Sequence, residues 1–336
     1  MNILYNYDLT KFTGFKTQVN VKKYVLIEHE NDFDVLPSIQ LLNPLIIGGG
    51  TNYLFVNPEI DEAISYIGTN ITLLEDSDKS SAVRVEAGKN WHEFIMEMLD
   101  NGLYGLENLV LIPGNVGAAP VQNIGAYGRE VSETIIAVHC LDLHSGERKT
   151  LTNEECMFQY RHSTFKSQEW KHFMITHVDF RLNKFESPMA KYPDVEEYLR
   201  EHEIESPKSK DIANAIIQIR NKKLPNPEFI GNAGSFFKNP IIPYSVYNDL
   251  KQIYLDMPSY PLNEHEVKLP AGWLIDKAGW KGYRFNGAGV HDRQALVLIN
   301  ADNAFGHDIY ELSTKIQNSV KELYGIDLEP EVNIIR

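Results

Sequence analysis

The chain has 336 residues and a hydrophobic fraction of 43%, and its 32 basic against 46 acidic side chains give a formal net charge of −14 at pH 7. Two or three domains are expected at roughly 100–200 residues each, and this much apolar material excludes a mainly disordered chain. The acidic balance argues against a general nucleic-acid binder, because neutralising phosphates requires clustered lysine and arginine.

Targeting segments and cysteine pairs are missing from the sequence. No apolar stretch approaches the roughly 20 residues that a membrane span needs, and the opening MNILYNYDLTKF has no basic region followed by an apolar one. Cys140 and Cys156 form no CxxC pair and no disulfide framework. We therefore expect a cytoplasmic protein without a membrane partner.

The predicted elements mix strands and helices. The clearest helix follows Asn90, an N-cap with Glu93 three residues later, and its apolar residues recur at helical spacing. Polar, proline-punctuated residues 184–210 predict a linker or a surface helix at a domain boundary. In chain order we expect strands at 44–47 and 83–87, the helix after Asn90, strands at 135–143 and 174–182, and helices at 209–222 and 308–324, the last closed by Gly325.

A triple glycine follows the first predicted strand. Gly48, Gly49 and Gly50 lead into Thr51 and Asn52. Such a run exposes backbone N–H groups with no Cβ in the way, which suits a diphosphate. A plain tight turn explains the three glycines equally well.

A second segment, Pro113–Gly128, is rich in small residues. Its 16 positions hold four glycines, three alanines and two prolines, and its large polar side chains include Gln122, Asn123 and Tyr127. A surface loop would be more hydrophilic. This composition suits backbone pressed against a large, flat, partly apolar ligand such as an isoalloxazine ring, with a buried packing loop as the alternative.

Familiar cofactor and nucleophile motifs are absent. The chain has no GxxxxGK[ST], HExxH, GxGxxG or GxSxG pattern, which argues against P-loop hydrolases, zinc proteases, Rossmann dehydrogenases and α/β-hydrolases. Neither the cysteines nor the 11 histidines show a ligand spacing, so no metal site is expected. Taken alone, Arg161 is typical of a surface arginine and Ser235 of a turn hydroxyl.

Basic residues gather in one region of this acidic chain. Between positions 220 and 239, Arg220, Lys222, Lys223 and Lys238 are balanced by Glu228 alone. A local basic pocket in an acidic protein predicts a compact polyanion as ligand, whereas the overall field discourages nucleic acid.

Taken together, these segments resemble the UDP-N-acetylenolpyruvoylglucosamine reductases of bacterial peptidoglycan synthesis, in the class with a tyrosine-bearing loop over the substrate. The resemblance covers nearly the whole chain, although residues 57–80 and 184–210 carry little of it. The matching segments include IIGGGTN, GLENLVLIPGNVGAAPVQNIGAYG, YRHSTFK, RNKKLPNP, GNAGSFFKNP and LEPEV.

The resemblance implies an α+β flavoenzyme with a vanillyl-alcohol-oxidase/PCMH-type FAD-binding fold and a C-terminal α+β substrate domain. The implied parts are FAD-binding subdomains at 1–70 and 71–185, a linker with a mobile tyrosine loop at 186–210, the substrate-binding domain at 211–327, and a tail at 328–336 that returns to the active site. Non-covalently bound FAD would contact Gly48, Gly49, Gly50, Thr51, Asn52, Pro113, Gly114, Gly117, Ala118, Gln122, Asn123, Gly125, Ala126 and Tyr127.

The resemblance also implies a UDP-sugar site and a monomer. Two positions depart from the family pattern: Pro193 follows the loop tyrosine where a small residue is usual, and Thr51 stands where serine is common. The residues implied to line the UDP-sugar site are Tyr160, Tyr192, Lys223, Asn239, Tyr260, Lys268 and Gln294.

The implied reaction is FAD-dependent reduction of UDP-N-acetylglucosamine enolpyruvate to UDP-N-acetylmuramate by NADPH, a step of cell wall synthesis on which cell shape and division depend. Hydride passes from flavin N5 to C3 of the enolpyruvyl group, so negative charge develops at C2 and its carboxylate. In the family pattern Arg161 and a protonated Glu331 stabilise this enediolate, and Ser235 donates the proton to C2.

Two other functions stay open on the residues alone. Another FAD oxidoreductase of the same fold, acting on small alcohols or hydroxy acids, would not need GNAGSFFKNP or the basic region after residue 220. A non-catalytic nucleotide-sugar-binding protein would have no reason to hold Arg161, Ser235 and Glu331 together.

Overall fold

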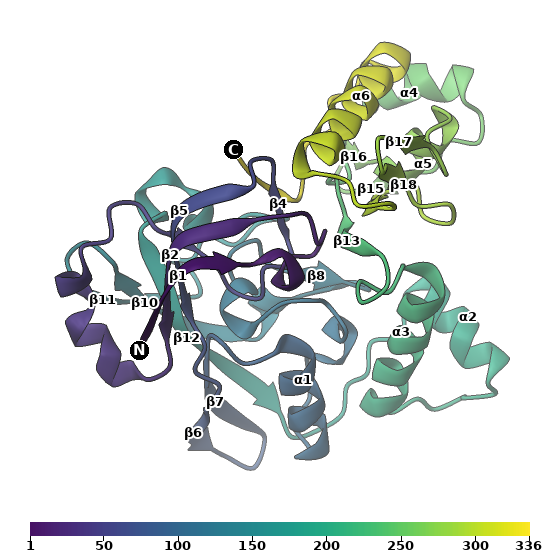
Figure 1. Cartoon of the computed structure of the whole chain (residues 1–336). Coiled ribbons are helices and arrows are strands. Elements are labelled where there is room, and N and C mark those ends of the chain that lie inside the picture. The colour runs from purple at the N-terminus through teal and green to yellow at the C-terminus, as the bar shows by residue number, and fades with distance from the viewer. The chain divides into compact units, whose positions relative to one another are not determined.

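The computed structural model describes residues 1–336, which divide into two compact units (Figure 1). The first unit comprises Met1–Tyr7, Val21–Gly50 and Ile60–Lys222, and the second comprises Asp8–Asn20, Thr51–Glu59 and Lys223–Arg336. Each unit has a hydrophobic core of its own. None of the helices combines the length and the apolar character that crossing a membrane demands.

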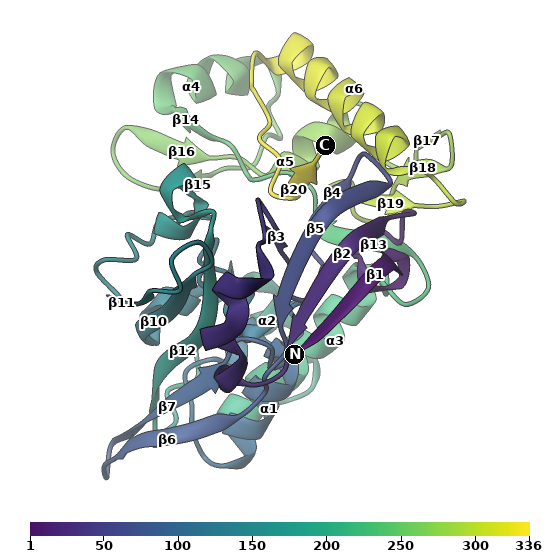
Figure 2. The same cartoon turned by 60° about the vertical axis from the view of Figure 1, so that its left-hand side comes forward.

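The first unit is built on two sheets. The larger is antiparallel and has the strand order β11-β10-β12-β7-β6, and β6 and β7 form a long hairpin (Figure 2). The smaller has the order β1-β2-β5-β3, and β8 and β9 form a separate pair. The strands are β1 (Asn2–Asp8), β2 (Asn20–Ile27), β3 (Leu45–Ile46), β5 (Glu59–Tyr66), β6 (Ile71–Asp76), β7 (Ser80–Glu86), β8 (Gly125–Ala126), β9 (Arg129–Glu130), β10 (Ile135–Asp142), β11 (Arg148–Thr152) and β12 (Phe173–Asn183).

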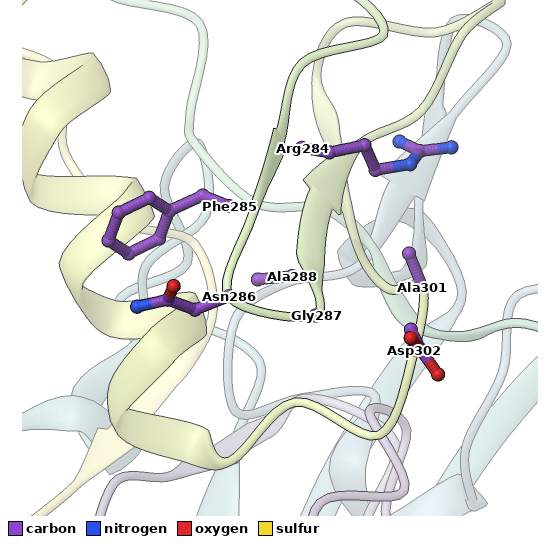
Figure 3. Close-up of a pocket in the computed structure, with 7 residues that line it drawn as sticks. All are labelled: Arg284, Phe285, Asn286, Gly287, Ala288, Ala301 and Asp302. Atoms are coloured by element: carbon purple, nitrogen blue, oxygen red, sulfur yellow. The ribbon is translucent and has the colours of Figure 1, made fainter.

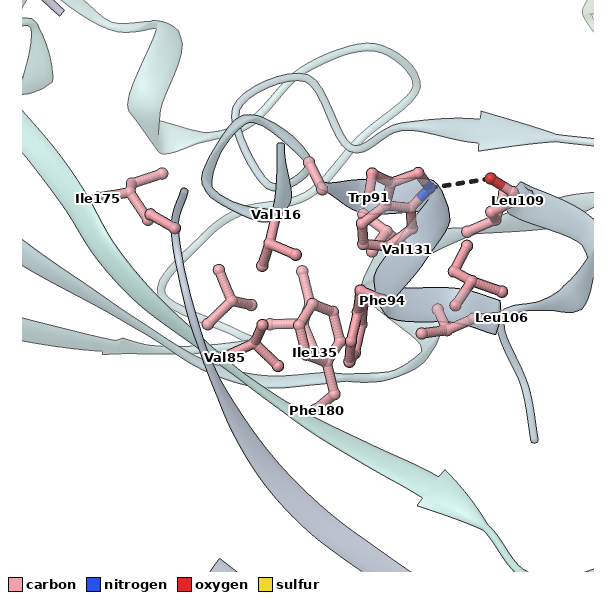
Figure 4. Close-up of a cluster of buried hydrophobic side chains, with 14 of the residues drawn as sticks. Val85, Trp91, Phe94, Leu106, Leu109, Val116, Val131, Ile135, Ile175 and Phe180 are labelled. Carbon is pink, nitrogen blue, oxygen red and sulfur yellow. Dashed lines mark hydrogen bonds between the residues drawn. The ribbon is translucent and has the colours of Figure 1, made fainter. Parts of the chain in front are cut away.

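Helix α1 (Trp91–Asp100) packs its apolar stripe against the larger sheet. Asn90 caps the helix by accepting a hydrogen bond from the backbone N–H of Glu93 at 3.0 Å. Trp91 and Phe94 are buried beside Phe180 of β12, and the Trp91 indole N–H donates to the Leu109 carbonyl oxygen at 2.9 Å (Figure 4). Burying a large apolar side chain contributes about 1.5–3 kcal/mol, so this face fixes the helix on the sheet.

The rest of the first unit is helical or irregular. Helix α2 (Pro193–Glu201) lies within the stretch expected to be a linker, and because Val195 and Leu199 are buried it is a docked surface helix. Helix α3 (Ser209–Lys223) follows. The short 3-10 helices of the whole chain are η1 (Thr10–Phe12), η2 (Glu30–Ile39), η3 (Glu107–Leu109), η4 (Val116–Ala118), η5 (Val131–Glu133), η6 (Thr164–Lys166) and η7 (Gln168–Trp170).

The second unit places three helices on small antiparallel sheets. Its four-stranded sheet has the order β13-β19-β18-β17, and its three-stranded sheet the order β14-β16-β15. The longest helix, α6 (Gly306–Tyr324), packs against β18 and β19 and ends at Gly325 with φ +68°. The elements are β4 (Tyr53–Phe55), β13 (Gly231–Ser235), β14 (Ile241–Pro243), α4 (Tyr244–Ile253), β15 (Tyr260–Pro261), β16 (Glu266–Lys268), α5 (Ala271–Lys277), β17 (Arg284–Phe285), β18 (Ala288–Val290), β19 (Val297–Asn300) and β20 (Asn333–Ile335).

The strands and helices expected from the sequence are confirmed, with ends that differ by a few residues. The predicted strands correspond to β3, β7, β10 and β12, and the predicted helices to α1, α3 and α6. Cys140 and Cys156 are both free and buried. The finer division into two FAD-binding subdomains, linker, substrate domain and tail stays a prediction.

Candidate functional site

In the first unit, the triple glycine and the small-residue loop touch one another. A Cβ built on Gly49 would lie 3.1 Å from Asn115 Oδ1 and 3.2 Å from Gly114 Cα, whereas one on Gly48 would meet Ala118 Cβ at 3.8 Å. A Cβ on Gly117 would lie only 2.5 Å from Ala87 Cβ. The glycines therefore allow two backbone segments to approach closely, as a shared cradle for a ligand requires.

The small-residue loop is fixed to the core through its backbone. Trp91 N–H donates to the Gly114 carbonyl oxygen at 3.0 Å, and Gly117 N–H donates to the Ala87 carbonyl oxygen at 2.9 Å. Val116 is fully buried, but Pro113 and Ala118 are exposed. One side of the loop is thus anchored while the other presents backbone and small apolar groups, which fits a flat ligand such as FAD. Gln122, Gly125 and Ala126 of the same loop are half-buried.

The side chain of Asn123 is buried and forms its hydrogen bonds within the protein. Its Nδ2 donates to Glu130 Oε2 at 2.7 Å, and its Oδ1 accepts from the Ser132 N–H at 3.1 Å. The side chain is 1% exposed and φ is +45°. Any contact between Asn123 and a cofactor would therefore come from its main chain.

The predicted catalytic arginine lies against the small-residue loop. Arg161 Nη2 donates to the Gly125 carbonyl oxygen at 2.7 Å, and a Cβ on Gly125 would come within 3.1 Å of Arg161 Nη1. The guanidinium also lies over the ring of Tyr160, 5.2 Å from its centroid. The structure thus places Arg161 against the predicted flavin loop, and the predicted substrate residue Tyr160 lies next to its guanidinium.

Tyr127 interacts with the side chains of Tyr192 and Arg220, which belong to the same unit. Its ring packs edge-on against Tyr192, with centroids 5.0 Å apart, and its hydroxyl interacts electrostatically with the guanidinium of Arg220 on α3. Burial raises the pKa of the Tyr127 hydroxyl and lowers the pKa of the Arg220 guanidinium, and each group opposes the shift of the other.

Arg220 is a residue that the sequence analysis counted only as part of a basic run. Its Nε–H is buried without an acceptor in the protein. A buried donor with no partner is costly, so a polar acceptor at this position fits the site. The only signal in the sequence was the local excess of positive charge near the end of α3.

In the second unit, the C-terminal tail pairs with the segment that follows Ser235. Glu331 N–H donates to the Phe236 carbonyl oxygen at 2.8 Å, and Lys238 N–H donates to the Glu329 carbonyl oxygen at 2.9 Å. Farther along, β20 pairs in parallel with β4. The main chain of Glu331, one predicted catalytic residue, is therefore hydrogen-bonded to the residue that follows Ser235, another, and Phe237 and Pro330 form an antiparallel bridge.

Ser235 occupies an irregular strand end. The register between β13 and β19 shifts between Asn232 and Ser235, and Gly234 has φ +71°, a value that glycine adopts readily. The Asn232 side chain accepts a hydrogen bond from the Gly234 N–H at 3.0 Å. This bulge sets the direction in which the serine leaves the strand.

Thr51 and Asn52 belong to the second unit, beside the tail. Asn52 Nδ2 donates to the Glu331 carbonyl oxygen at 3.2 Å, and its own carbonyl oxygen accepts from the Asn333 N–H at 3.0 Å. The glycines of the same motif belong to the first unit. Arg161 also belongs to the first unit and Ser235 and Glu331 to the second, so the convergence of the three stays a prediction.

Four predicted substrate residues gather around one corner of the second unit, where β16 leads into α5. Lys268 on β16 pairs with Tyr260 on β15, and the Asn239 side chain accepts a hydrogen bond from the Ala271 N–H at 2.9 Å. The Gln294 side-chain oxygen lies 3.2 Å from where a Cβ of Gly272 would be. Lys223, the fifth predicted substrate residue in this unit, is the first residue of its segment Lys223–Arg336.

The cavity in Figure 3 lies elsewhere in the second unit. It has a volume of about 350 Å³ and surrounds the β17–β18 turn, where Asn286 and Gly287 both have positive φ, +46° and +79°. Its lining residues are Arg284, Phe285, Asn286, Gly287, Ala288, Ala301 and Asp302, none of them predicted to act in the site.

Two groups of potential metal ligands come together that sequence spacing did not indicate. Asp142, His144 and His172 place their ligand atoms within 4.8 Å of one another, but the two imidazole rings stack at an interplanar angle of 5°. A single ion cannot lie in both of two parallel ring planes. The second group is Glu30, Glu86 and His177, in which His177 Nε2 lies 2.8 Å from Glu30 Oε1.

Comparison with known proteins identifies the family to which the chain is similar. Residues 225–335 match the model of the UDP-N-acetylenolpyruvoylglucosamine reductase C-terminal domain, and residues 42–152 match an FAD binding domain. The UDP-N-acetylenolpyruvoylglucosamine reductase of Flavobacterium johnsoniae is 40% identical over 338 residues and covers 100% of both chains. That of Chromobacterium violaceum is 41% identical over 332 residues, which are 98% of this chain and 97% of the relative.

A solved structure supports the fold. The crystal structure of UDP-N-acetylenolpyruvylglucosamine reductase from Thermus caldophilus matches with a TM-score of 0.67 at 23% identity, over 100% of this chain and 98% of that one. The α+β class, with an FAD-binding domain followed by a C-terminal reductase domain, is therefore confirmed.

Proposed function

Because the chain belongs to the family of UDP-N-acetylenolpyruvoylglucosamine reductases, we propose that it reduces UDP-N-acetylglucosamine enolpyruvate to UDP-N-acetylmuramate with NADPH. The FAD-binding domain and the reductase relatives make it an FAD oxidoreductase of peptidoglycan synthesis. The proposed substrates and the two free thiols suit the reducing cytoplasm, and the proposed active form is a monomer.

The two glycine-rich segments of the first unit would hold the cofactor. Gly48–Gly50 offers backbone N–H groups for the diphosphate, and the exposed side of Pro113–Gly128 offers a small, partly apolar surface for the flavin. Bound FAD supplies the hydride that C3 of the enolpyruvyl group receives. Holding FAD and substrate in one orientation is then the task of the protein.

Three side chains would stabilise the negative charge of the enediolate and supply the proton to C2. Arg161 offers a fixed fork of donors to the carboxylate end of the developing enediolate, and a protonated Glu331 offers one more donor. A well-aimed donor of this kind is worth about 3–4 kcal/mol in the transition state. Ser235 would deliver its hydroxyl proton to C2, which its short side chain can do only if the backbone places it correctly.

The corner of the second unit would recognise the nucleotide sugar. Lys268 supplies a cation beside Tyr260 and near Asn239 and Gln294, a combination suited to phosphates and a sugar. Lys223 adds a second cation. In the first unit, Tyr160 and Tyr192 would complete the substrate site.

The observation that carries this proposal is the pairing of the tail with the Ser235 segment. The hydrogen bond from Glu331 N–H to the Phe236 carbonyl oxygen, 2.8 Å long, ties the main chain of Glu331 to the residue that follows Ser235, as the two proposed roles require. Neither a simple alcohol oxidase nor a binding protein needs this pair.

An anaerobic titration followed at the flavin absorption band tests the proposal. NADPH should bleach the band of the purified FAD-loaded protein, and UDP-N-acetylglucosamine enolpyruvate should restore it with one equivalent of UDP-N-acetylmuramate formed. UDP-N-acetylglucosamine, which lacks the enol ether, is the matched control and should restore nothing. The proposed reaction is refuted if small precursors of hydroxy acids reoxidise the reduced flavin, or if the enol ether does not reoxidise it.

A further inference from the structure

Asn108, in the short helix η3, joins two segments that lie far apart in the sequence. Its side chain is 2% exposed. The amide nitrogen donates to the Tyr127 carbonyl oxygen at 3.1 Å and to the Met189 carbonyl oxygen at 3.0 Å. Tyr127 is part of the predicted flavin loop, and Met189 precedes the loop tyrosine Tyr192. One side chain therefore uses both of its N–H donors to tie these loops together.

Side chains of the same two segments are also packed together. The rings of Tyr127 and Tyr192 meet edge-on with centroids 5.0 Å apart. A Cβ on Gly128, whose φ is +80°, would come within 3.0 Å of the Met189 methyl group. Glycine at 128 thus leaves room for Met189, and the tyrosine loop rests directly on the end of the flavin loop.

The residue before Asn108 anchors the other end of the tyrosine loop. Glu107 is 3% exposed; its carboxylate accepts from the Gly105 N–H at 2.7 Å and from the Ser209 hydroxyl at 3.0 Å. Ser209 is the first residue of α3 and is fully buried. Consecutive residues of η3 therefore hold the chain at positions 189 and 209, on either side of Tyr192 and α2.

We propose that Asn108 is a positioning residue that latches the tyrosine loop onto the flavin loop and so sets the affinity for the UDP-linked enol ether. The proposal rests on the function proposed above. Asn108 acts through the two backbone carbonyls and not on substrate itself. Without its two donors, the hydrogen bond from Asn108 to the Met189 carbonyl oxygen is lost and the packing of Met189 and Tyr192 holds the loop less firmly. The substrate must then order the loop at the expense of its own binding.

The chain offers a matched control. Asn153 also uses its amide to bridge two backbone carbonyls, those of Ser132 at 2.8 Å and Ile135 at 2.9 Å. Neither partner belongs to the tyrosine loop or to Pro113–Gly128. Asn108→Ala and Asn153→Ala remove the same chemistry from two places, so a general loss of stability would appear in both.

The first readout is independent of substrate. Lys191 is exposed and lies between Met189 and Tyr192, so trypsin cleavage after it reports release of the loop. Asn108→Ala should raise this cleavage rate about tenfold, the loss expected for one to two buried hydrogen bonds, and Asn153→Ala should leave it unchanged. Asn108→Asp, which keeps the shape but replaces the donors with an oxygen, should behave like the alanine variant.

The second readout separates the two half-reactions of the FAD-loaded enzyme. Asn108→Ala should raise KM for the enol ether about tenfold while the flavin stays bound and its reduction by NADPH stays within about threefold of wild type. If Asn108→Ala does not fold, Asn108→Ser, which keeps one donor, is measured instead and should give a smaller shift in the same direction.

Each outcome decides between the latch and its alternatives. Equal behaviour of the Asn108 and Asn153 variants in proteolysis and KM overturns the latch, as does loss of flavin without release of the loop. A wild-type enzyme that is reduced by NADPH but ignores the enol ether would refute the proposed function instead. In that case the rate of trypsin cleavage after Lys191 would still show whether Asn108 holds the tyrosine loop.

Discussion

Replacing Gly117 by alanine tests how the small-residue loop is held. The new Cβ would lie 2.5 Å from Ala87 Cβ and 3.2 Å from the Ala87 carbonyl oxygen. Carbon atoms pack comfortably at about 3.5–4.0 Å, so the loop must move by roughly 1 Å. Overpacking of this kind lowers the free energy of unfolding by about 1–3 kcal/mol. The movement also strains the hydrogen bond from Gly117 N–H to the Ala87 carbonyl oxygen, 2.9 Å long.

Gly48→Ala is the matched control, because it should weaken FAD binding without lowering the stability of the apo protein. Its Cβ would have Ala118 Cβ at 3.8 Å, an ordinary contact, and its φ is not positive. The free energy of unfolding of the apo variant should therefore lie within about 0.5 kcal/mol of the wild-type value. If the diphosphate lies against this backbone, however, the added methyl group displaces it, and the dissociation constant for FAD should rise at least about tenfold, or ~1.4 kcal/mol.

Urea unfolding of the apo protein and fluorescence titration with FAD measure the two quantities separately. Gly117→Ala should lose stability first and FAD affinity as a consequence, whereas Gly48→Ala should lose FAD affinity alone. The cradle argument is refuted if Gly48→Ala binds FAD like wild type. It is equally refuted if the Gly48 variant is destabilised in the apo form as much as the Gly117 variant.

Three further predictions concern single side chains. Ser235→Ala should leave flavin reduction by NADPH nearly intact while reoxidation by the enol ether slows about 10²–10⁴-fold in stopped flow; equal losses in both steps would remove Ser235 as the proton donor. Glu331→Gln keeps a donor and should lower kcat less than Glu331→Ala; the reverse order would exclude a protonated carboxyl. Burial opposes the shift, but hydrogen bonds from Arg84 and His139 lower the pKa of Asp179 from 3.8 to about 2. The stability that Asp179 contributes is therefore present above pH 3.8 and lost as the pH falls toward 2. The difference in unfolding free energy between wild type and Asp179→Asn, measured with urea, should become smaller from about pH 5 to pH 3. If this difference stays constant, the ion pair is not its cause.

Elements with a strong local pattern could be predicted from the sequence. Helix α1 follows an N-cap at Asn90 and has a regular apolar stripe, and its observed start agrees with that cap. Helix α6 ends where Gly325 adopts φ +68°. In both cases the residues that decide the boundary are neighbours in the chain, so local spacing contains the information.

Contacts between distant segments could not be predicted in this way. His172 meets His144 because β10 and β12 are neighbours in the sheet, and a separation of 28 positions matches no ligand spacing. The link from Asn108 to Met189 spans 81 positions. Helix α2 was left open between linker and surface helix, because only Val195 and Leu199 provide its buried face and two apolar positions give too weak a periodicity.

The segment around Ser235, the proposed proton donor, shows why such a residue is hard to recognise by itself. A serine side chain reaches only a short distance, so the backbone must place the hydroxyl. Phe236 and Phe237 are 0% and 1% exposed and pack edge-on with ring centroids 4.9 Å apart, which anchors the strand immediately after the serine. The Phe236 carbonyl then binds the tail at Glu331. The buried phenylalanines and the glycine bulge carry the distinctive sequence, and Ser235 depends on them for its position. A search for an isolated serine would therefore overlook this proposed proton donor, whereas the whole segment GNAGSFFKNP gives the prediction its specificity.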